Sequence, residues 1–223
     1  MVRLQGAEEF GVEANQVKVK ILALSLAAVA LVEAGLVFSK AAFNPMLRLG
    51  AARLLELGFM VCVVHVVEGS VAFIGLDRTR WLAGLRRGFI WSAGFGAISG
   101  IAFGVLYMAG LNPLPFIRTA LPKNSPNLFF FFLVGGIVAP VAEEVFFRGI
   151  LYGFLRRWGF AVALVLSTAA FALTHGLGHG FPLVQVIGGF LFAVAYEIEK
   201  NLLVPVTIHC LGNLAIFALS STF

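Results

Sequence analysis

Charged residues are scarce in this chain: only 12% of its 223 residues are Asp, Glu, Lys or Arg, whereas 60% are apolar. Because soluble globular domains carry about 25% charged residues, this composition excludes a soluble domain, a disordered region and a nucleic-acid-binding module. Cysteine is scarce too, and both Cys62 and Cys210 lie inside apolar runs, so a disulfide-held secreted scaffold is also excluded. Asp77 is the sole aspartate, which excludes chemistry that needs an Asp pair.

In place of charge, the sequence has four stretches of 19 to 39 residues without Asp, Glu, Lys or Arg. About 20 apolar residues cross a bilayer as a helix, so each stretch can hold one span and the longest can hold two. The stretches are Gly88–Ile117, Asn124–Ala142, Trp158–Tyr196 and Asn201–Phe223. The chain is therefore predicted to be an all-α polytopic transmembrane helical bundle of about seven spans, forming one integral membrane domain over residues 1–223.

The apolar pattern and the turn residues divide the chain into seven predicted helices. The fourth of them contains Pro140, which can break a helix because proline lacks a backbone N–H. The segment Asn112–Asn127 holds four prolines and is the clearest loop. The predicted helices are 19–39, 54–76, 88–110, 127–156, 160–177, 183–199 and 202–221.

The distribution of Lys and Arg predicts how the bundle is oriented. With the N-terminus in the cytoplasm, the inner segments hold ten basic residues and the outer segments hold five, including Arg48 and Arg53. The positive-inside rule favours this arrangement. No cleavable signal peptide is evident before the first apolar run, and the chain lacks organellar targeting features. We therefore expect a multi-pass protein of a prokaryotic plasma membrane with a cytoplasmic N-terminus.

Three charged residues, Glu143, Glu144 and Arg148, fall in the fourth predicted helix. An ionised side chain at the centre of a membrane helix costs about 2.5–3.5 kcal/mol, so such residues are candidates for a functional site. Glu144 and Arg148 are four residues apart on one helical face and are predicted to form an ion pair. Glu143 points about 100° away from Glu144 and is left free for a proton or a water. The alternative is a buried ionic network that only holds the bundle together.

The apolar helices that follow carry further polar residues at helical spacing. His175 lies four residues after Phe171, and Asn213 lies four residues after His209, so the members of each pair share a helical face. A histidine within a span is more often a packed, hydrogen-bonded residue than a catalyst. Three such polar groups together with a Glu pair favour a catalytic site. Glu33, His65 and Glu68, in the first two predicted helices, are better explained as internal polar contacts, with His65 and Glu68 close enough to pair.

These residues resemble the motifs of the CAAX-prenyl-protease and bacteriocin-processing family of intramembrane proteins. The EExxxR motif of that family matches residues 143–148, its FxxxH motif matches residues 171–175, and its HxxxN motif matches residues 209–213. The three motifs occur in order on successive apolar helices, and residues 127–223 are the predicted family core. Residues 1–121 share only their hydropathy with the family.

The resemblance implies an intramembrane endopeptidase that acts on a membrane-associated protein or peptide. It assigns Glu143 as general base and His175 as its partner in activating a water, with His209 and Asn213 forming the oxyanion hole. Glu144 and Arg148 would hold the helix and the base in place. Prenylated CAAX proteins, bacteriocin precursors and pheromone precursors all stay open as substrates. The lipid bilayer is the other expected partner, and nucleic acid is not expected.

Two alternatives to this metal-independent, glutamate-type protease stay open. Carboxylate and imidazole ligands suit zinc, so a zinc protease could use Glu143, His175 and His209 as its metal ligands. A non-catalytic immunity or regulatory protein, or a proton-coupled transporter, could use the same polar cluster. Other intramembrane protease classes are disfavoured, since the sequence lacks GxSxG, HExxH and a pair of aspartates.

Overall fold

The computed structural model describes residues 16–38, 44–176 and 181–222, and within these ranges the chain is all helical, without strands. The predicted all-α bundle and its seven helical regions are confirmed. The regions are α1 (Val19–Phe38), α2 (Pro45–Glu68), α3 (Trp81–Met108), a long helix over Ser125–Trp158, α7 (Phe160–Thr174), α8 (Leu183–Glu199) and α9 (Leu203–Ser220). Short 3₁₀ turns lie at Val71–Ile74, Arg78–Arg80 and Leu114–Phe116.

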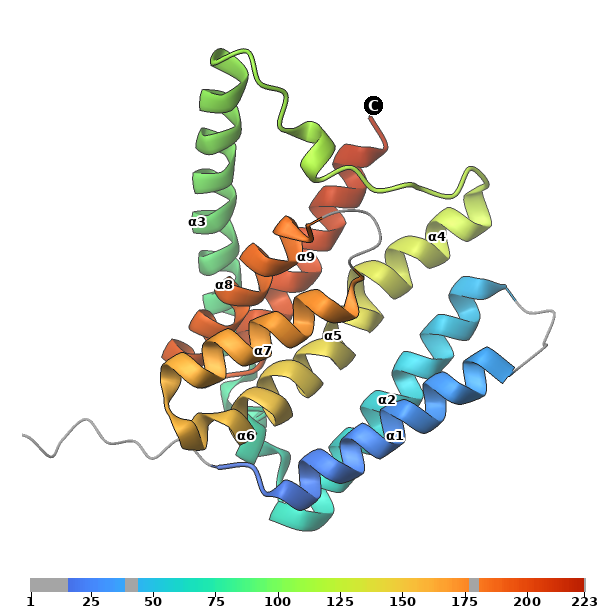
Figure 1. The fold of residues 1–223 in the computed structure, drawn as a ribbon, viewed down its shortest axis with the longest axis vertical. Coiled ribbons are helices and arrows are strands. Elements are labelled where there is room, and N and C mark those ends of the chain that lie inside the picture. The colour runs from blue at the N-terminus through green and yellow to red at the C-terminus, as the bar shows by residue number, and fades with distance from the viewer. Residues whose placement is uncertain (1–15, 39–43, 177–180, 223) are drawn as a thin grey trace, which may run out of the picture.

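The helices form three groups around the middle of the long helix (Figure 1). The hairpin of α1 and α2 packs on one side of the long helix, and the pair α7 and α8 packs on another. Helix α9 lies against the long helix, α8 and α3. This arrangement places the long helix, α7 and α9 next to one another, which are the three elements that carry the sequence motifs.

The long helix runs through Pro140 without a break, contrary to the expectation that proline could interrupt it. Its segments are α4 (Ser125–Leu133), a π-helical segment over Val134–Val138, α5 (Ala139–Glu144), a second π-helical segment over Val145–Tyr152, α6 (Gly153–Leu155) and a final 3₁₀ turn at Arg156–Trp158. The first π segment, after which the Ala139 N–H bonds to the Val134 carbonyl, ends at Val138, two residues before Pro140. A π turn widens the helix locally, so the helix accommodates the proline.

The second helix begins and ends earlier than predicted. The Asn44 side chain accepts a hydrogen bond from the Met46 backbone N–H at 2.8 Å, and Pro45 occupies the first turn, which together start α2 at residue 45 rather than 54. Gly69 adopts a left-handed conformation with φ of 75° and ends the helix at residue 68 rather than 76. Arg53, expected in an outer segment, therefore lies inside the helix.

The third helix also differs from its predicted bounds, because it starts at Trp81 rather than at residue 88. The basic residues Arg86 and Arg87 therefore belong to its first two turns instead of the preceding connector. Both side chains are exposed, and long basic side chains at a helix end can extend toward the membrane surface.

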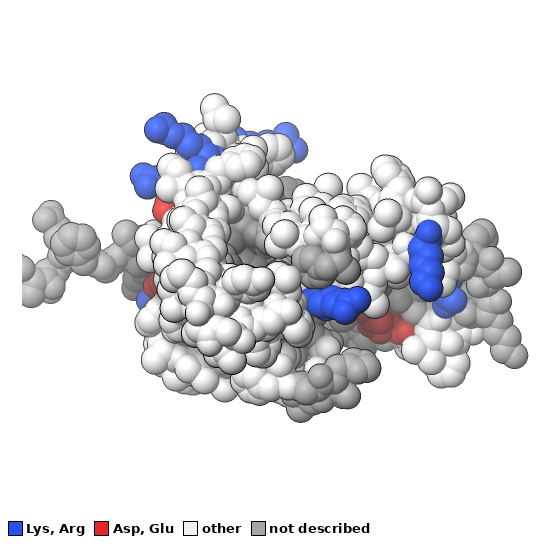
Figure 2. Space-filling view, turned by 90° about the horizontal axis from the view of Figure 1, so that it is seen from above, with Lys and Arg blue, Asp and Glu red and all other residues white. Residues whose placement is uncertain are grey.

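The outer surface of the bundle has the character of a lipid-facing surface. Most of the surface visible in Figure 2 belongs to uncharged residues, and large apolar side chains are exposed on α1, α2, α3 and the long helix. Within the part of the chain that the structure describes, five helices are long and apolar enough to cross a membrane: α1, α2, α3 with its preceding turn, the long helix and α9. Helix α7 is apolar but shorter. The chain is an integral membrane protein.

Candidate active site

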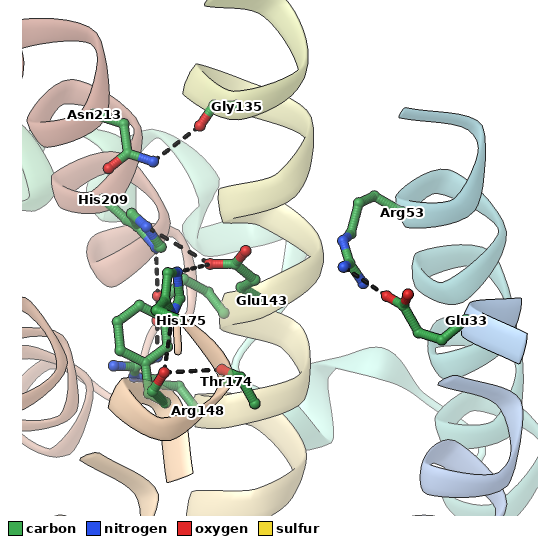
Figure 3. A network of polar contacts seen from close by, with 11 residues as sticks. Glu33, Arg53, Gly135, Glu143, Arg148, Thr174, His175, His209 and Asn213 are labelled. Atoms are coloured by element: carbon green, nitrogen blue, oxygen red, sulfur yellow. Dashed lines mark hydrogen bonds and ion pairs between the residues drawn. The ribbon is translucent and has the colours of Figure 1, made fainter. Parts of the chain in front are cut away.

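Three predicted site residues from separate motifs meet inside the bundle. Glu143 lies in α5, His175 directly follows α7, and His209 lies in α9. The Glu143 Oε2 atom is 3.9 Å from His175 Nε2 and 3.8 Å from His209 Nε2 (Figure 3). Glu143 and His175 are partly exposed, whereas His209 is buried. One carboxylate therefore faces two imidazole rings in a site that is open on the Glu143 and His175 side.

The orientation of His175 is set by the backbone of its own helix. Its Nδ1 atom is 2.9 Å from the Phe171 carbonyl oxygen, one turn earlier. A carbonyl oxygen can only accept a hydrogen bond, so Nδ1 carries the proton in this contact. The neutral ring then presents the lone pair of Nε2 toward Glu143. The spacing of four residues between Phe171 and His175 thus fixes the tautomer as well as the direction of the ring.

The orientation of His209 is set by the neighbouring ion pair of the long helix. Glu144 and Arg148 form the predicted contact, with Arg148 Nη1 at 3.2 Å from Glu144 Oε1, and both side chains are fully buried. The same Glu144 oxygen lies 2.8 Å from His209 Nδ1. An ionised Glu144 accepts from Nδ1, which leaves Nε2 of His209 directed toward Glu143.

The guanidinium of Arg148 is enclosed by aromatic rings from three helical segments. Its Cζ atom lies 4.7 Å from the ring centre of Phe171, 5.2 Å from Phe192 and 5.8 Å from Phe147. Arg148 Nη2 also donates to the Gly189 carbonyl at 3.1 Å. Rings around a desolvated cation stabilise it by about 2 kcal/mol, so the cage offsets part of the cost of burying this charge.

A glycine allows α8 to approach the arginine this closely. A Cβ atom at Gly189 would lie 3.1 Å from Phe171 Cδ1 and 3.2 Å from Thr168 Cγ2. Phe192, one turn along α8, stacks on the His209 ring with centroids 4.6 Å apart and planes 22° apart. Phe192 was not among the predicted site residues, because an apolar residue in an apolar helix carries no distinguishing signal in the sequence.

Asn213 shares its helical face with His209 as predicted, but it points to the backbone of the first π segment. Its Nδ2 atom donates to the Gly135 carbonyl at 2.9 Å (Figure 3). In a π-helix a carbonyl accepts from the N–H five residues later, which for Gly135 would be that of residue 140. Residue 140 is a proline and has no backbone N–H. Asn213 therefore satisfies a carbonyl that the Pro140 site leaves without a helical partner. The second N–H of its amide is not used in this contact.

A second charged cluster lies in the spans of α1 and α2. Arg53 contacts Glu33 of α1 at 2.7 Å and Glu56 of α2 at 2.5 Å. The predicted polar contact of Glu33 is confirmed, but its side chain is 42% exposed and so is not internal. The sequence analysis missed Glu56, although its spacing of three residues from Arg53 is a helical pairing signal; the misplaced start of α2 concealed it.

The predicted pairing of His65 with Glu68 is replaced by another contact. Glu68 binds Lys18 at 3.2 Å, while His65 is exposed at the surface of α2. Lys18 directly precedes α1, so the hairpin of α1 and α2 brings this lysine to the last residue of α2. The contact is structural and stands apart from the residues around Glu143.

The donor atoms near Glu143 are of the types that zinc prefers, namely a carboxylate and two imidazoles. Within residues 16–38, 44–176 and 181–222, however, no group of three His, Cys, Asp or Glu side chains is arranged to hold a metal ion. The side chains as they stand are oriented by Phe171 and Glu144 toward a shared space next to Glu143.

Comparison with known proteins relates part of the chain to a protease family. Residues 125–215 match the family described as type II CAAX prenyl endopeptidase Rce1-like. The chain is 35% identical over 95 residues to the membrane-embedded CAAX protease MroQ of Staphylococcus aureus (strain USA300), covering 39% of this chain and 36% of that protein. It is 35% identical over 83 residues to YdiL of Bacillus subtilis (strain 168), whose name describes a membrane peptidase, covering 36% and 33%.

The matched part spans about a third of the length of these curated relatives. The family match over residues 125–215 contains all three motifs, so the resemblance inferred from them is confirmed there. No solved structure matches the chain.

Proposed function

We propose that this chain, whose residues 125–215 match the Rce1-like CAAX endopeptidase family, is an intramembrane endopeptidase that hydrolyses a peptide bond of a membrane-associated protein or peptide. The observation that carries the proposal is the position of Glu143, whose carboxylate faces the Nε2 atoms of both His175 and His209 at 3.8–3.9 Å. These separations exceed a direct hydrogen bond, and they leave Glu143 available to a water.

In the proposed mechanism, Glu143 is the general base and His175 positions the water. A water between them donates one hydrogen to the Glu143 carboxylate and the other to the lone pair of His175 Nε2. As the water oxygen attacks the carbonyl carbon of the substrate, its proton passes to Glu143. Glu143 then returns the proton to the leaving amine nitrogen as the C–N bond breaks.

His209 and Asn213 are proposed to stabilise the oxyanion of the tetrahedral intermediate. Donation from His209 requires a proton on Nε2 in addition to the one on Nδ1, and a protonated ring would pair with Glu144 at 2.8 Å and with Glu143 at 3.8 Å. Asn213 would use the amide N–H that Gly135 does not accept. Donors of this kind act strongly where water is excluded, as in a membrane interior.

The test is to purify the wild-type protein and Glu143→Gln and to compare the peptide products from a membrane-anchored peptide by mass spectrometry. The wild type should cleave, and the variant should fold normally without cleaving. Equal products from both proteins would contradict the role of Glu143. If neither protein cleaves while both keep a biological effect, a regulatory or immunity role is favoured; loss of uptake in the variant without new peptides favours a proton-coupled transporter.

We propose that the reaction needs no metal. A chelator added to the same assay should leave cleavage unchanged, whereas loss of activity that zinc restores would assign Glu143, His175 and His209 as zinc ligands. We also propose a cytoplasmic N-terminus, on the basis of the Lys and Arg distribution, and a prokaryotic plasma membrane, because the two relatives named above are bacterial. Whether the substrate is prenylated is decided by offering prenylated and unmodified versions of one peptide.

A further inference from the structure

The cluster of Glu33, Arg53 and Glu56 has no part in the mechanism above, yet it is charged and lies within two membrane spans. Ionisable side chains in a span are costly and mark functional positions more often than not. Its two carboxylates and one guanidinium carry a formal charge of −1 when all are ionised. One ion pair is enough to connect α1 to α2, and the pair of Arg53 with Glu33 already supplies it. Glu56 is therefore the member that needs an explanation.

Burial increases along the cluster from the outside inward. The exposed side-chain fraction is 42% at Glu33, 22% at Arg53 and 3% at Glu56. The Oε1 atom of Glu56 is buried and has no hydrogen-bond partner among the described residues. Helix α2 packs on α5, the segment that carries Glu143. The polar groups therefore lead from a partly exposed entrance on α1 to the neighbourhood of the proposed base.

We propose that Glu33, Arg53 and Glu56 form the polar route by which water reaches Glu143. The inference rests on the proposed function, since hydrolysis consumes one water per peptide bond and the site lies within an apolar bundle. A water inside a protein needs two to four polar partners, and the three side chains supply them in sequence. The unpartnered Glu56 oxygen is the acceptor closest to the end of this route.

The neighbouring hollow between α2, α5 and α9 is unsuited to the same task. It has a volume of about 420 Å³ and is lined by leucine, valine and glycine residues. An apolar cavity stays dry because it offers water no hydrogen bonds. The polar cluster, which runs from Glu33 on α1 to the buried Glu56 on α2, is thus the better path for water from the hairpin side.

The first test detects water without relying on peptidase activity. Hydroxyl radicals generated by X-ray pulses from water oxidise the side chains beside that water, and Met60 lies one turn after Glu56 on the same face of α2. Met60 is only 1% exposed, so its oxidation in the wild type would report internal water. We expect Glu56→Leu to lower the rate of Met60 oxidation about tenfold, the factor that corresponds to the free energy of one lost hydrogen bond. Glu56→Gln should preserve the rate.

The second test measures turnover in the same variants. Glu56→Gln keeps polar atoms of the same size and should keep kcat within about twofold, whereas Glu56→Leu should lower kcat about tenfold with KM unchanged. If the cluster only holds α1 and α2 together through its ion pairs, both variants should lose stability and activity alike. This result would overturn the proposal. Unaltered Met60 oxidation in Glu56→Leu, or none in the wild type, would overturn it as well.

Glu68 provides the matched control. It is a largely buried carboxylate on the same helix, paired to a basic residue and with one unpartnered oxygen, but it lies at the end of α2 next to Lys18. Glu68→Leu should leave Met60 oxidation and kcat unchanged. If Glu56→Leu does not fold, Glu33→Leu at the partly exposed entrance takes its place with the same expected direction. A wild type that shows internal water but no cleavage would refute the proposed function while leaving the water route standing.

Discussion

Replacing Arg148 by methionine should sharply destabilise the protein, and the structure gives the magnitude. Arg148 and Glu144 are both fully buried and 3.2 Å apart. Without the guanidinium, Glu144 keeps a single partner, His209 Nδ1, while its Oε2 atom already lacks one. Removing one member of a buried ion pair costs about 3–5 kcal/mol because the remaining charge is left uncompensated. We expect the free energy of unfolding of Arg148→Met to fall by that amount.

The double variant Glu144→Gln/Arg148→Met separates stability from activity. With both charges removed, no unpaired carboxylate is left buried at residue 144. Methionine at residue 148 fills space among the rings of Phe147, Phe171 and Phe192. Replacing a buried ion pair as a whole is often close to neutral, so most of the lost stability should return. Peptide cleavage should stay low, because the charged acceptor that holds His209 Nδ1 is gone.

The measurement is unfolding in mixed micelles of increasing SDS fraction, followed by tryptophan fluorescence, with cleavage of a membrane-anchored peptide assayed in parallel. Glu144→Gln alone completes the cycle of four proteins. The reasoning is refuted if Arg148→Met unfolds like the wild type, or if the double variant is as unstable as Arg148→Met. Full recovery of cleavage in the double variant would show that His209 does not need the charge of Glu144, because the glutamine oxygen can still accept from Nδ1.

Three further predictions test the site and its packing. Asn213→Ala should lower kcat about 10²–10³-fold if Asn213 is an oxyanion donor, and should cost about 1 kcal/mol of stability because Gly135 loses its hydrogen-bond donor; full turnover with reduced stability would assign it a structural role only. Gly88→Ala should destabilise by about 1–3 kcal/mol, since its Cβ would lie 2.5 Å from Thr207 Cβ. Gly96→Ala on the same helix should be harmless, as nothing lies within 4 Å, and thermal unfolding in detergent compares the two. Incubation with a chelator should leave the melting temperature as well as cleavage unchanged, whereas a fall that zinc reverses would indicate a bound metal.

The sequence predicted the parts of this protein that depend on local spacing. The apolar runs fix the number of helices, and the spacing of four residues between Glu144 and Arg148 sufficed to predict their contact. The predicted start of α2 was wrong, since Arg53 was placed in an outer segment and lies inside the helix. In the structure two carboxylates neutralise that arginine, and one of them, Glu33, lies on another helix. A partner of this kind is invisible without the tertiary arrangement.

Other features could not be predicted because they depend on helices packing together. Phe192 contributes its ring to both His209 and Arg148, but many phenylalanines in apolar helices look the same in sequence. The contact of Asn213 with Gly135 arises from a π segment before Pro140, whereas sequence reasoning offered only a continuous or a broken helix. In each case the missing information is a non-local contact.

The two histidines of the site are held in different ways, and this difference explains how the three motifs depend on one another. His175 is oriented by the carbonyl of Phe171 in its own helix, so the FxxxH spacing is sufficient by itself. His209 is oriented by Glu144, which lies 65 residues away and is itself held by Arg148. The orientation of His209 in the HxxxN motif therefore depends on the second Glu and the Arg of EExxxR. It follows that substitutions of Glu144 or Arg148 should disturb His209 before they disturb His175.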